Sequence, residues 1–201
     1  EIKSYKDFLD PKWKNKIVLN DPTIPGSAGR WAILVGNYMT DLGWDYHMAL
    51  ANQNPILMRD ERIMAEWLAR GKYPILIGVE RQVRDFKELG MPVELIVLKE
   101  GNYGASGYGN VSVMSNAPHP NATNIFLNWL LSKEGQTIVT ITQVKQSSRL
   151  DTPIDHLHKD QIREEATKAG GKFLNPSDEE FMEVLAKYSS VVKEIYGPLN
   201  K

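Results

Sequence analysis

The chain contains no cysteine among its 201 residues, which excludes disulfide bonds, thiolate catalysis and cysteine metal sites. Neither sign of charge is in marked excess, because the chain has 24 basic and 25 acidic residues. A net charge of −1 provides no basic field for nucleic acid or for an anionic membrane. No apolar run approaches the ~20 residues of a membrane span. The opening residues EIKSYKDFLDPKWK are too charged for the apolar segment of a signal peptide.

Familiar catalytic and metal-binding motifs are missing as well. The sequence has no GxSxG, no phosphate loop ending in GK[ST], no HExxH and no GxGxxG after a strand. His156 and His158 lie two positions apart, but no pattern of carboxylates completes a zinc site, so a surface loop is the better interpretation. We therefore expect neither a metal nor a cofactor. One enzymatic alternative stays open, in which Asp21 and Glu80 at neighbouring strand ends act as acid and base.

The first half of the chain alternates short apolar runs with amphipathic stretches. Residues 16–20, 73–79 and 93–98 are expected to be strands, and helices are expected around residues 31–42, 46–52, 60–70 and 81–89. Asp60 is a candidate helix cap, and Gly71 and Gly90 are expected at helix ends, with Gly43 as a helix stop. Strands alternating with helices predict a mostly parallel, three-layer α/β unit over residues 1–100.

The second half is different in composition. Residues 101–110 are glycine-rich and are expected to form a hinge or crossover, followed by a short strand at 111–114 and a mainly helical part to residue 201. Asn121 follows two prolines and is a candidate cap for a helix with one buried face, which would carry Ile125, Phe126, Trp129 and Leu130. Ser177 and Glu180 form a capping box for the last helix.

Several segments resemble one family in the right order. They are SYKDFLDPKWKNKIVLNDP, RDERIMAEWLARGKYPILIG, KEGNYG, NAPHPNATNIFLNWLLSKEGQ, QSSRLDTP and EIYGPL. The chain thereby resembles the bacterial extracellular solute-binding proteins of ABC importers, of the type 2 periplasmic-binding-protein fold and the branch often labelled iron(III)-type. Such proteins usually exceed 300 residues. The resemblance therefore implies a C-terminal fragment, with residues 1–100 as the second lobe and residues 111–201 as the end of the first.

The resemblance implies a substrate-binding subunit that captures a small polar or anionic solute between two lobes and delivers it to a membrane permease. It places the protein in the periplasm or outside the cell, with or without a membrane tether. Ferric-binding members carry paired tyrosines after the strand ending at Val79, and this chain reads GVERQVRDF there, so iron binding by that route is not expected. Full-length protein is expected to be monomeric, whereas the fragment could pair with itself through an uncovered apolar face.

Candidate solute contacts follow from the rule that open parallel sheets bind ligands beyond the carboxyl ends of their strands. A helix N-terminus attracts anions, and the arginine fork suits carboxylate or phosphate. Each candidate also has a plain structural explanation, such as a helix cap, a turn glycine or a solvated charge. The expected contacts are Asp21, Ser27, Gly29, Arg59, Glu80 and, near the hinge, Tyr103. A ligand-sensing domain of a regulator with the same fold is the other non-enzymatic alternative, although no helix-turn-helix is visible.

Overall fold

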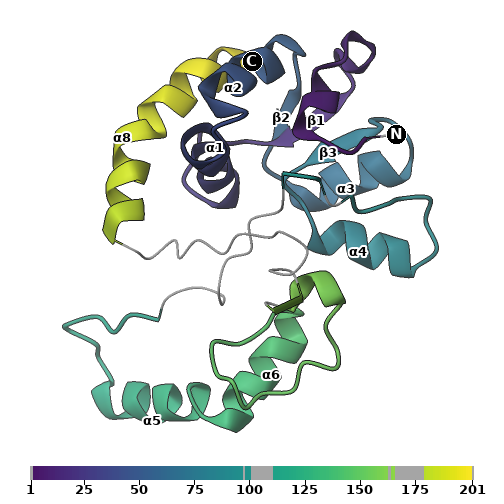
Figure 1. Cartoon of the computed structure of the whole chain (residues 1–201). Helices are drawn as coiled ribbons and strands as arrows, with labels where there is room; N and C mark the ends of the chain where they lie inside the picture. Colours follow the sequence, from purple (N-terminus) through teal and green to yellow (C-terminus); the bar gives the residue numbers. More distant parts are fainter. Residues whose placement is uncertain (1, 97, 101–110, 163, 166–178, 201) are drawn as a thin grey trace. The chain divides into compact units, whose positions relative to one another are not determined.

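The computed structural model describes residues 2–96, 98–100, 111–162, 164–165 and 179–200 (Figure 1). The chain divides into two compact units, one of Glu1–Glu100 with Pro176–Lys201 and the other of Gly101–Asn175. This division differs from the expected one, because the last helix belongs with the first unit instead of with the residues that precede it. The expected hinge at 101–110, the capping box at Ser177 and the contact residue Tyr103 lie outside the described residues.

The sheet of the first unit has three parallel strands, β1 (Ile17–Asn20), β2 (Ile56–Met58) and β3 (Ile75–Ile77), in the order β2-β1-β3. Val18 of the central strand lies opposite Ile56 on one side and Leu76 on the other. The predicted strands at 16–20 and 73–79 are confirmed in shortened form, and β2 was not expected. The predicted strands at 93–98 and 111–114 are wrong, since their described residues have no strand partner.

Helices cover both faces of this sheet. Ile17 and Leu19 pack with α1 (Ser27–Tyr38), α2 (Gly43–Asn52) and α8 (Glu179–Tyr196), whereas Val18 points to the other face and packs with α3 (Glu61–Ala69) and α4 (Arg81–Glu88). This alternation is the period of two that strands impose, so every residue of a central strand is buried. The three-layer α/β architecture predicted from the sequence is confirmed. Short 3₁₀ segments complete the unit as η1 (Tyr5–Leu9), η2 (Pro11–Trp13) and η4 (Gly197–Leu199).

Local signals in the sequence set several helix boundaries. The Asp60 carboxylate accepts hydrogen bonds of 3.0 Å from the backbone N–H groups of Arg62 and Ile63 and so caps α3 as predicted. Gly71, after the same helix, has a φ of 69°, a conformation that glycine adopts without strain. Gly43 was expected only to stop a helix. Its N–H does donate to the carbonyl oxygen of Met39, the residue just after α1, but Gly43 is also the first residue of α2.

The described part of the second unit holds α5 (Pro120–Leu130), α6 (Lys133–Gln143) and η3 (Lys159–Gln161). The cap prediction for α5 is wrong, because His119 occupies the cap position and Pro120, which needs no N–H partner, begins the helix. The predicted buried face is also wrong, since Ile125 is 72% and Phe126 54% exposed. Spacing revealed the amphipathic stripe but not what covers it.

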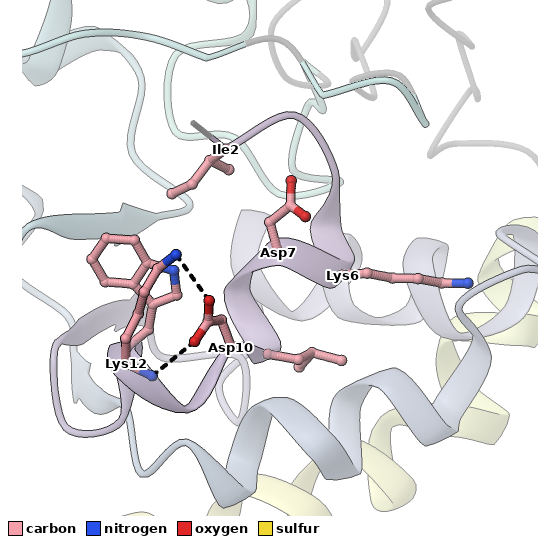
Figure 2. Close-up of a pocket in the computed structure, with 7 residues that line it drawn as sticks. Ile2, Lys6, Asp7, Asp10 and Lys12 are labelled. Atoms are coloured by element: carbon pink, nitrogen blue, oxygen red, sulfur yellow. Dashed lines mark hydrogen bonds and ion pairs between the residues drawn. The ribbon is translucent and has the colours of Figure 1, made fainter.

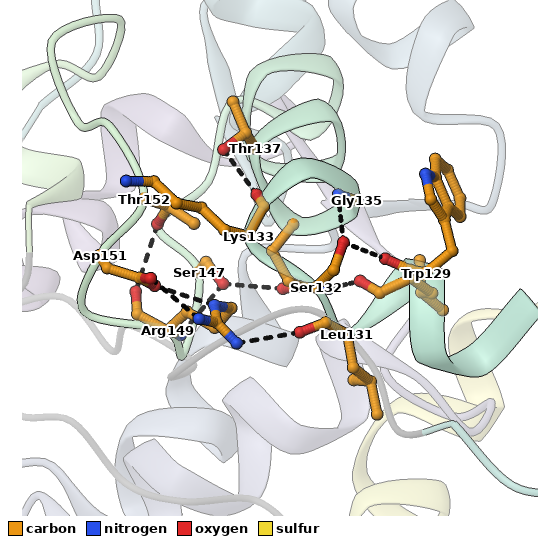
Figure 3. A network of polar contacts seen from close by, with 12 residues as sticks. Trp129, Leu131, Ser132, Lys133, Gly135, Thr137, Ser147, Arg149, Asp151 and Thr152 are labelled. Atoms are coloured by element: carbon orange, nitrogen blue, oxygen red, sulfur yellow. Dashed lines mark hydrogen bonds and ion pairs between the residues drawn. The ribbon is translucent and has the colours of Figure 1, made fainter.

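A polar network holds the corner between α5 and α6 (Figure 3). The Ser132 hydroxyl donates to the Trp129 carbonyl and accepts from the Gly135 N–H, which caps α6. Arg149 binds both carboxylate oxygens of Asp151 at 2.8 Å and donates to the Leu131 carbonyl. The corner is therefore built on charge-assisted and capping hydrogen bonds.

Candidate functional site

Asp21 follows the last residue of β1 at the carboxyl edge of the sheet and is almost fully buried. Its Oδ1 accepts from the backbone N–H of Thr23 at 2.9 Å and from the Thr23 hydroxyl at 2.6 Å, and its Oδ2 accepts from Nε of Arg59 at 3.1 Å. Burial acts to raise the pKa of the Asp21 carboxyl, but the bonds from Thr23 and Arg59 outweigh burial and lower that pKa. The group is therefore a fixed negative charge.

Arg59 follows β2 and stands beside the adjacent strand end. Its side chain is 65% exposed, whereas that of Asp21 is 2% exposed, so the buried carboxylate orients a guanidinium group that reaches solvent. Among the described residues, only Nε of this group has a hydrogen-bond partner. The two terminal nitrogens thus remain in position to bind a carboxylate or phosphate in the bidentate manner. Asp21 and Arg59 thus come together at this edge, and their contact with a solute stays a prediction.

An open hollow of about 500 Å³ lies at these strand ends. Its lining comes from Asp21, Leu57, Met58, Arg59, Asp60 and Asn200. The volume falls in the range of small-molecule sites. Asn200 comes from the end of the chain and was not among the expected contacts, since no local pattern links position 200 with position 21.

A polar cluster that sequence reasoning missed occupies the neighbouring part of this edge. Asn20 donates to Glu61 at 3.2 Å and to the Gly78 carbonyl at 3.4 Å, and Gln82 donates to the other oxygen of Glu61 at 3.0 Å. The cluster ties the ends of β1 and β3 to the first turns of α3 and α4. Gly78 has a φ of 98°, and a Cβ there would come within 3.0 Å of the Asn20 side chain. These contacts give the cluster a role in holding the edge together.

Ser27 and Gly29 stand in the first turn of α1, and neither lines the hollow. Ser27 is exposed. The cap position of α1 is held by Gly26, which has no side chain that could cap the helix. A Cβ at Gly29 would lie 3.1 Å from the carbonyl oxygens of Pro22 and Ile24, so the preceding loop itself requires glycine there. This close packing explains Gly29 without a ligand, and a solute contact by either residue stays a prediction.

Glu80 stands at the start of α4 and is exposed. Its carboxylate accepts from Nε of Arg84 at 2.9 Å, one helical turn later, and it does not line the hollow. The structure brings no Asp21–Glu80 acid–base pair together, because Arg59 and Thr23 engage one carboxylate while Arg84 engages the other. The lowered pKa of Asp21 also makes this carboxyl a poor proton donor.

A second hollow, of about 330 Å³, lies before β1, between η1 and η2 (Figure 2). Asp10 and Lys12 in its lining satisfy one another, with the Lys12 ammonium 2.8 Å from the Asp10 carboxylate. This ion pair is solvent-exposed, and within the part of the chain that the structure describes no buried carboxylate orients it as Asp21 orients Arg59. The hollow at the strand ends is therefore the better candidate for a solute.

Within the described ranges, no three His, Asp or Glu side chains gather as a set of metal ligands. No helix among the described residues combines the length and the apolar character that crossing a membrane requires. His156 and His158 belong to no such set of metal ligands within those ranges. His156 is hydrogen bonded to the Thr140 carbonyl, and His158 stands at the cap of η3.

Comparison with known proteins defines the class. The family model of the bacterial extracellular solute-binding proteins matches residues 1–145. The chain belongs to this family.

Two relatives set the scale of the similarity. An uncharacterized protein of Haemophilus influenzae (strain ATCC 51907 / DSM 11121 / KW20 / Rd) is 30% identical over 139 residues, which are 68% of this chain and 39% of that protein. The periplasmic binding protein AfuA of Actinobacillus pleuropneumoniae, in a structure with exogenous fructose 6-phosphate bound, aligns with a TM-score of 0.61 and 25% identity. That alignment covers 96% of this chain and 60% of AfuA. The chain thus spans less than two thirds of either relative.

Proposed function

We propose that this protein is the substrate-binding subunit of an ABC importer and that it captures a small anionic solute at the carboxyl edge of the β2-β1-β3 sheet. Membership of the solute-binding family supports the transport role. The family is defined by binding, which argues against turnover of the solute. Fructose 6-phosphate, the compound bound to AfuA, makes a phosphorylated sugar the first solute to test.

One observation carries the choice of an anion. The Arg59 guanidinium is held through Nε by the buried Asp21 carboxylate, and its largely exposed side chain lines the hollow. A cation held in advance loses little conformational freedom on binding. Such a group binds a carboxylate or phosphate more strongly than a freely rotating surface arginine does.

The proposed mechanism is closure of two lobes over the solute. A solute that contacts both lobes binds the closed state more tightly than the open state and shifts the population toward closure. The closed form would then be recognised by the membrane permease. This cycle places the protein in the periplasm or at the outer face of the cell, with membrane tethering compatible with the role. The role of residues 101–110 as the hinge belongs to this proposal.

The test uses the full-length protein that contains this chain. It is purified without refolding, examined by native mass spectrometry for a retained solute, and then titrated calorimetrically with fructose 6-phosphate, inorganic phosphate and fructose. We expect binding of at least one anion and a rise in melting temperature that grows with its concentration. Binding of uncharged fructose alone, or of no compound in a wider screen of anions and cations, would contradict the proposal.

A pair of arginine variants separates the site from general charge. Arg59→Ala is expected to weaken anion binding by more than about tenfold, because a charge-assisted hydrogen bond contributes roughly 1.5–3 kcal/mol. Arg62→Ala removes a more exposed arginine, which pairs at 3.6 Å with Glu66. This control is expected to leave the dissociation constant unchanged.

A further inference from the structure

A series of hydrogen bonds connects Arg59, which follows β2, with Asn200, which follows η4. Arg59 donates to Asp21, the Thr23 hydroxyl donates to the other oxygen of Asp21, and Nδ2 of Asn200 donates to the Thr23 hydroxyl at 3.2 Å. Asn200 and Thr23 are 177 positions apart in sequence. The contact therefore depends on the return of the chain through α8 and η4 to the first unit.

The donors and acceptors in this series of hydrogen bonds fix the orientation of the Asn200 amide. The only hydrogen of the Thr23 hydroxyl is used in the 2.6 Å bond to the charged carboxylate of Asp21. Thr23 is then an acceptor for Asn200, so the amide nitrogen faces Thr23 and the amide oxygen faces away from it. No described residue donates to that oxygen, and Asn200 lines the same hollow as Arg59.

The hollow thus offers two different kinds of hydrogen-bonding group. Arg59 offers cationic donors, and Asn200 offers a neutral acceptor on a side chain from another part of the chain. An amide oxygen accepts from a hydroxyl or amine of a ligand but does not bind a bare anion. A solute that uses both groups carries an anionic group together with a hydrogen-bond donor, and the hydroxyls of the fructose 6-phosphate bound to AfuA make a hydroxyl the donor to test first.

We propose that Asn200 is a specificity-determining residue of the solute site, accepting a hydrogen bond from a hydroxyl of the solute whose anionic group binds Arg59. This inference rests on the proposed function. It names the solute class as small hydroxylated anions, whether sugar phosphates or hydroxycarboxylic acids. It also makes the C-terminal segment after α8 a part of the site, so that the site is complete only when this segment is docked.

The experiment compares four probes on the full-length protein by calorimetry. Fructose 6-phosphate and gluconate are the hydroxylated anions of the two sources, inorganic phosphate is the anion without a carbon-bound hydroxyl, and fructose lacks the charge. Asn200→Ala is expected to weaken the preferred hydroxylated anion about three- to tenfold, the value of one neutral hydrogen bond, and to change phosphate binding less than twofold. Asn52→Ala, at an exposed asparagine at the end of α2, is the matched control and is expected to behave as wild type.

A structural readout separates recognition from loss of docking. The backbone amides of Val192 and Tyr196 lie in the part of α8 that packs on the first unit, and their hydrogen exchange reports whether this helix stays docked. We expect their exchange in Asn200→Ala to match wild type. The inference is overturned if the variant binds the hydroxylated anion as wild type does, if it weakens phosphate equally, or if exchange at α8 rises. If wild type binds neither hydroxylated anion, this inference fails, whereas the proposed function fails only if the wider screen of anions and cations also finds no binding.

Discussion

The Tyr196 hydroxyl and Nδ1 of His47 lie 2.8 Å apart, although 149 positions separate the two residues. The other ring nitrogen, Nε2, lies 2.8 Å from the Ala32 carbonyl oxygen. A carbonyl only accepts, so Nε2 carries the proton and Nδ1 accepts from Tyr196. Both side chains are fully buried. One neutral imidazole therefore connects α8 to α1 and α2.

We predict that this histidine makes the first unit less stable in mild acid. Burial lowers the pKa of His47 from 6.5 to about 4. Between these values the unfolded chain binds the proton more readily than the folded one, so the free energy of unfolding falls as the pH drops from about 6.5 toward 4, by up to roughly 3 kcal/mol. Urea unfolding followed by tryptophan fluorescence across this range measures the slope. His47→Gln is expected to reduce it, whereas His119→Gln, at an exposed histidine, is expected to leave it unchanged.

Tyr196→Phe tests the same contact without changing charge. The variant keeps the ring but leaves Nδ1 of His47 buried without a donor, which is expected to cost about 1–3 kcal/mol of unfolding free energy. Tyr188→Phe is the matched control, because Tyr188 stacks on Trp44 through its ring at 5.3 Å. We expect less than about 0.5 kcal/mol there. Equal losses in both variants would show that the Tyr196 hydroxyl contributes no more than that of Tyr188.

Gly36→Ala tests the packing of α2 on α1. A Cβ at position 36 would lie 2.7–2.9 Å from ring atoms of Trp44, closer than packed carbon atoms approach. Alanine in a helix ordinarily gains about 1 kcal/mol over glycine, but overpacking is expected to reverse this and lower the unfolding free energy by about 1–3 kcal/mol. Gly197→Ala, where a Cβ meets no atom within 4 Å, is the control for denaturant unfolding. A stabilised Gly36→Ala protein would contradict the packing described here.

Asp21→Asn tests the support behind Arg59. An amide has only one acceptor oxygen, so either the Arg59 Nε–H or the Thr23 N–H would face an amide N–H, and we expect a loss of about 1–3 kcal/mol at pH 7. The loss for Asp10→Asn in the exposed pair with Lys12 is expected to be smaller. The pKa of folded Asp21 is lowered, so its stabilisation is complete above the ordinary aspartate pKa of about 4 and is lost as the pH falls through the folded value. Wild type and variant are expected to converge in acid in urea titrations. A gap that stays constant down to pH 2 would show that the charge of Asp21 is not its source.

The sequence predicted which positions lie at the edge of the sheet but not which side chains pair there. Asp21 could be placed at this edge because it follows a short apolar run, whereas Arg59 was placed there only as the residue before a helix cap, since β2 was not expected. Glu80 obeyed the same rule, yet its carboxylate turned to Arg84 one helical turn away. The rule places a backbone position at an edge but does not choose among nearby partners. The Asn20–Glu61–Gln82 cluster went unnoticed for the same reason.

Local signals in the sequence were enough to predict the alternation of strands and helices, the Asp60 cap and the glycine ends of helices, because each depends on residues close together in the chain. It also carried the family resemblance that the comparisons confirm. Three relations could be seen only in the folded chain: α8 packs with the first unit, His47 is a buried neutral link, and Asn200 reaches Thr23. These relations join positions more than 100 residues apart. Local propensity carries no information about them, because they arise when burial of apolar surface selects one packing of the whole chain.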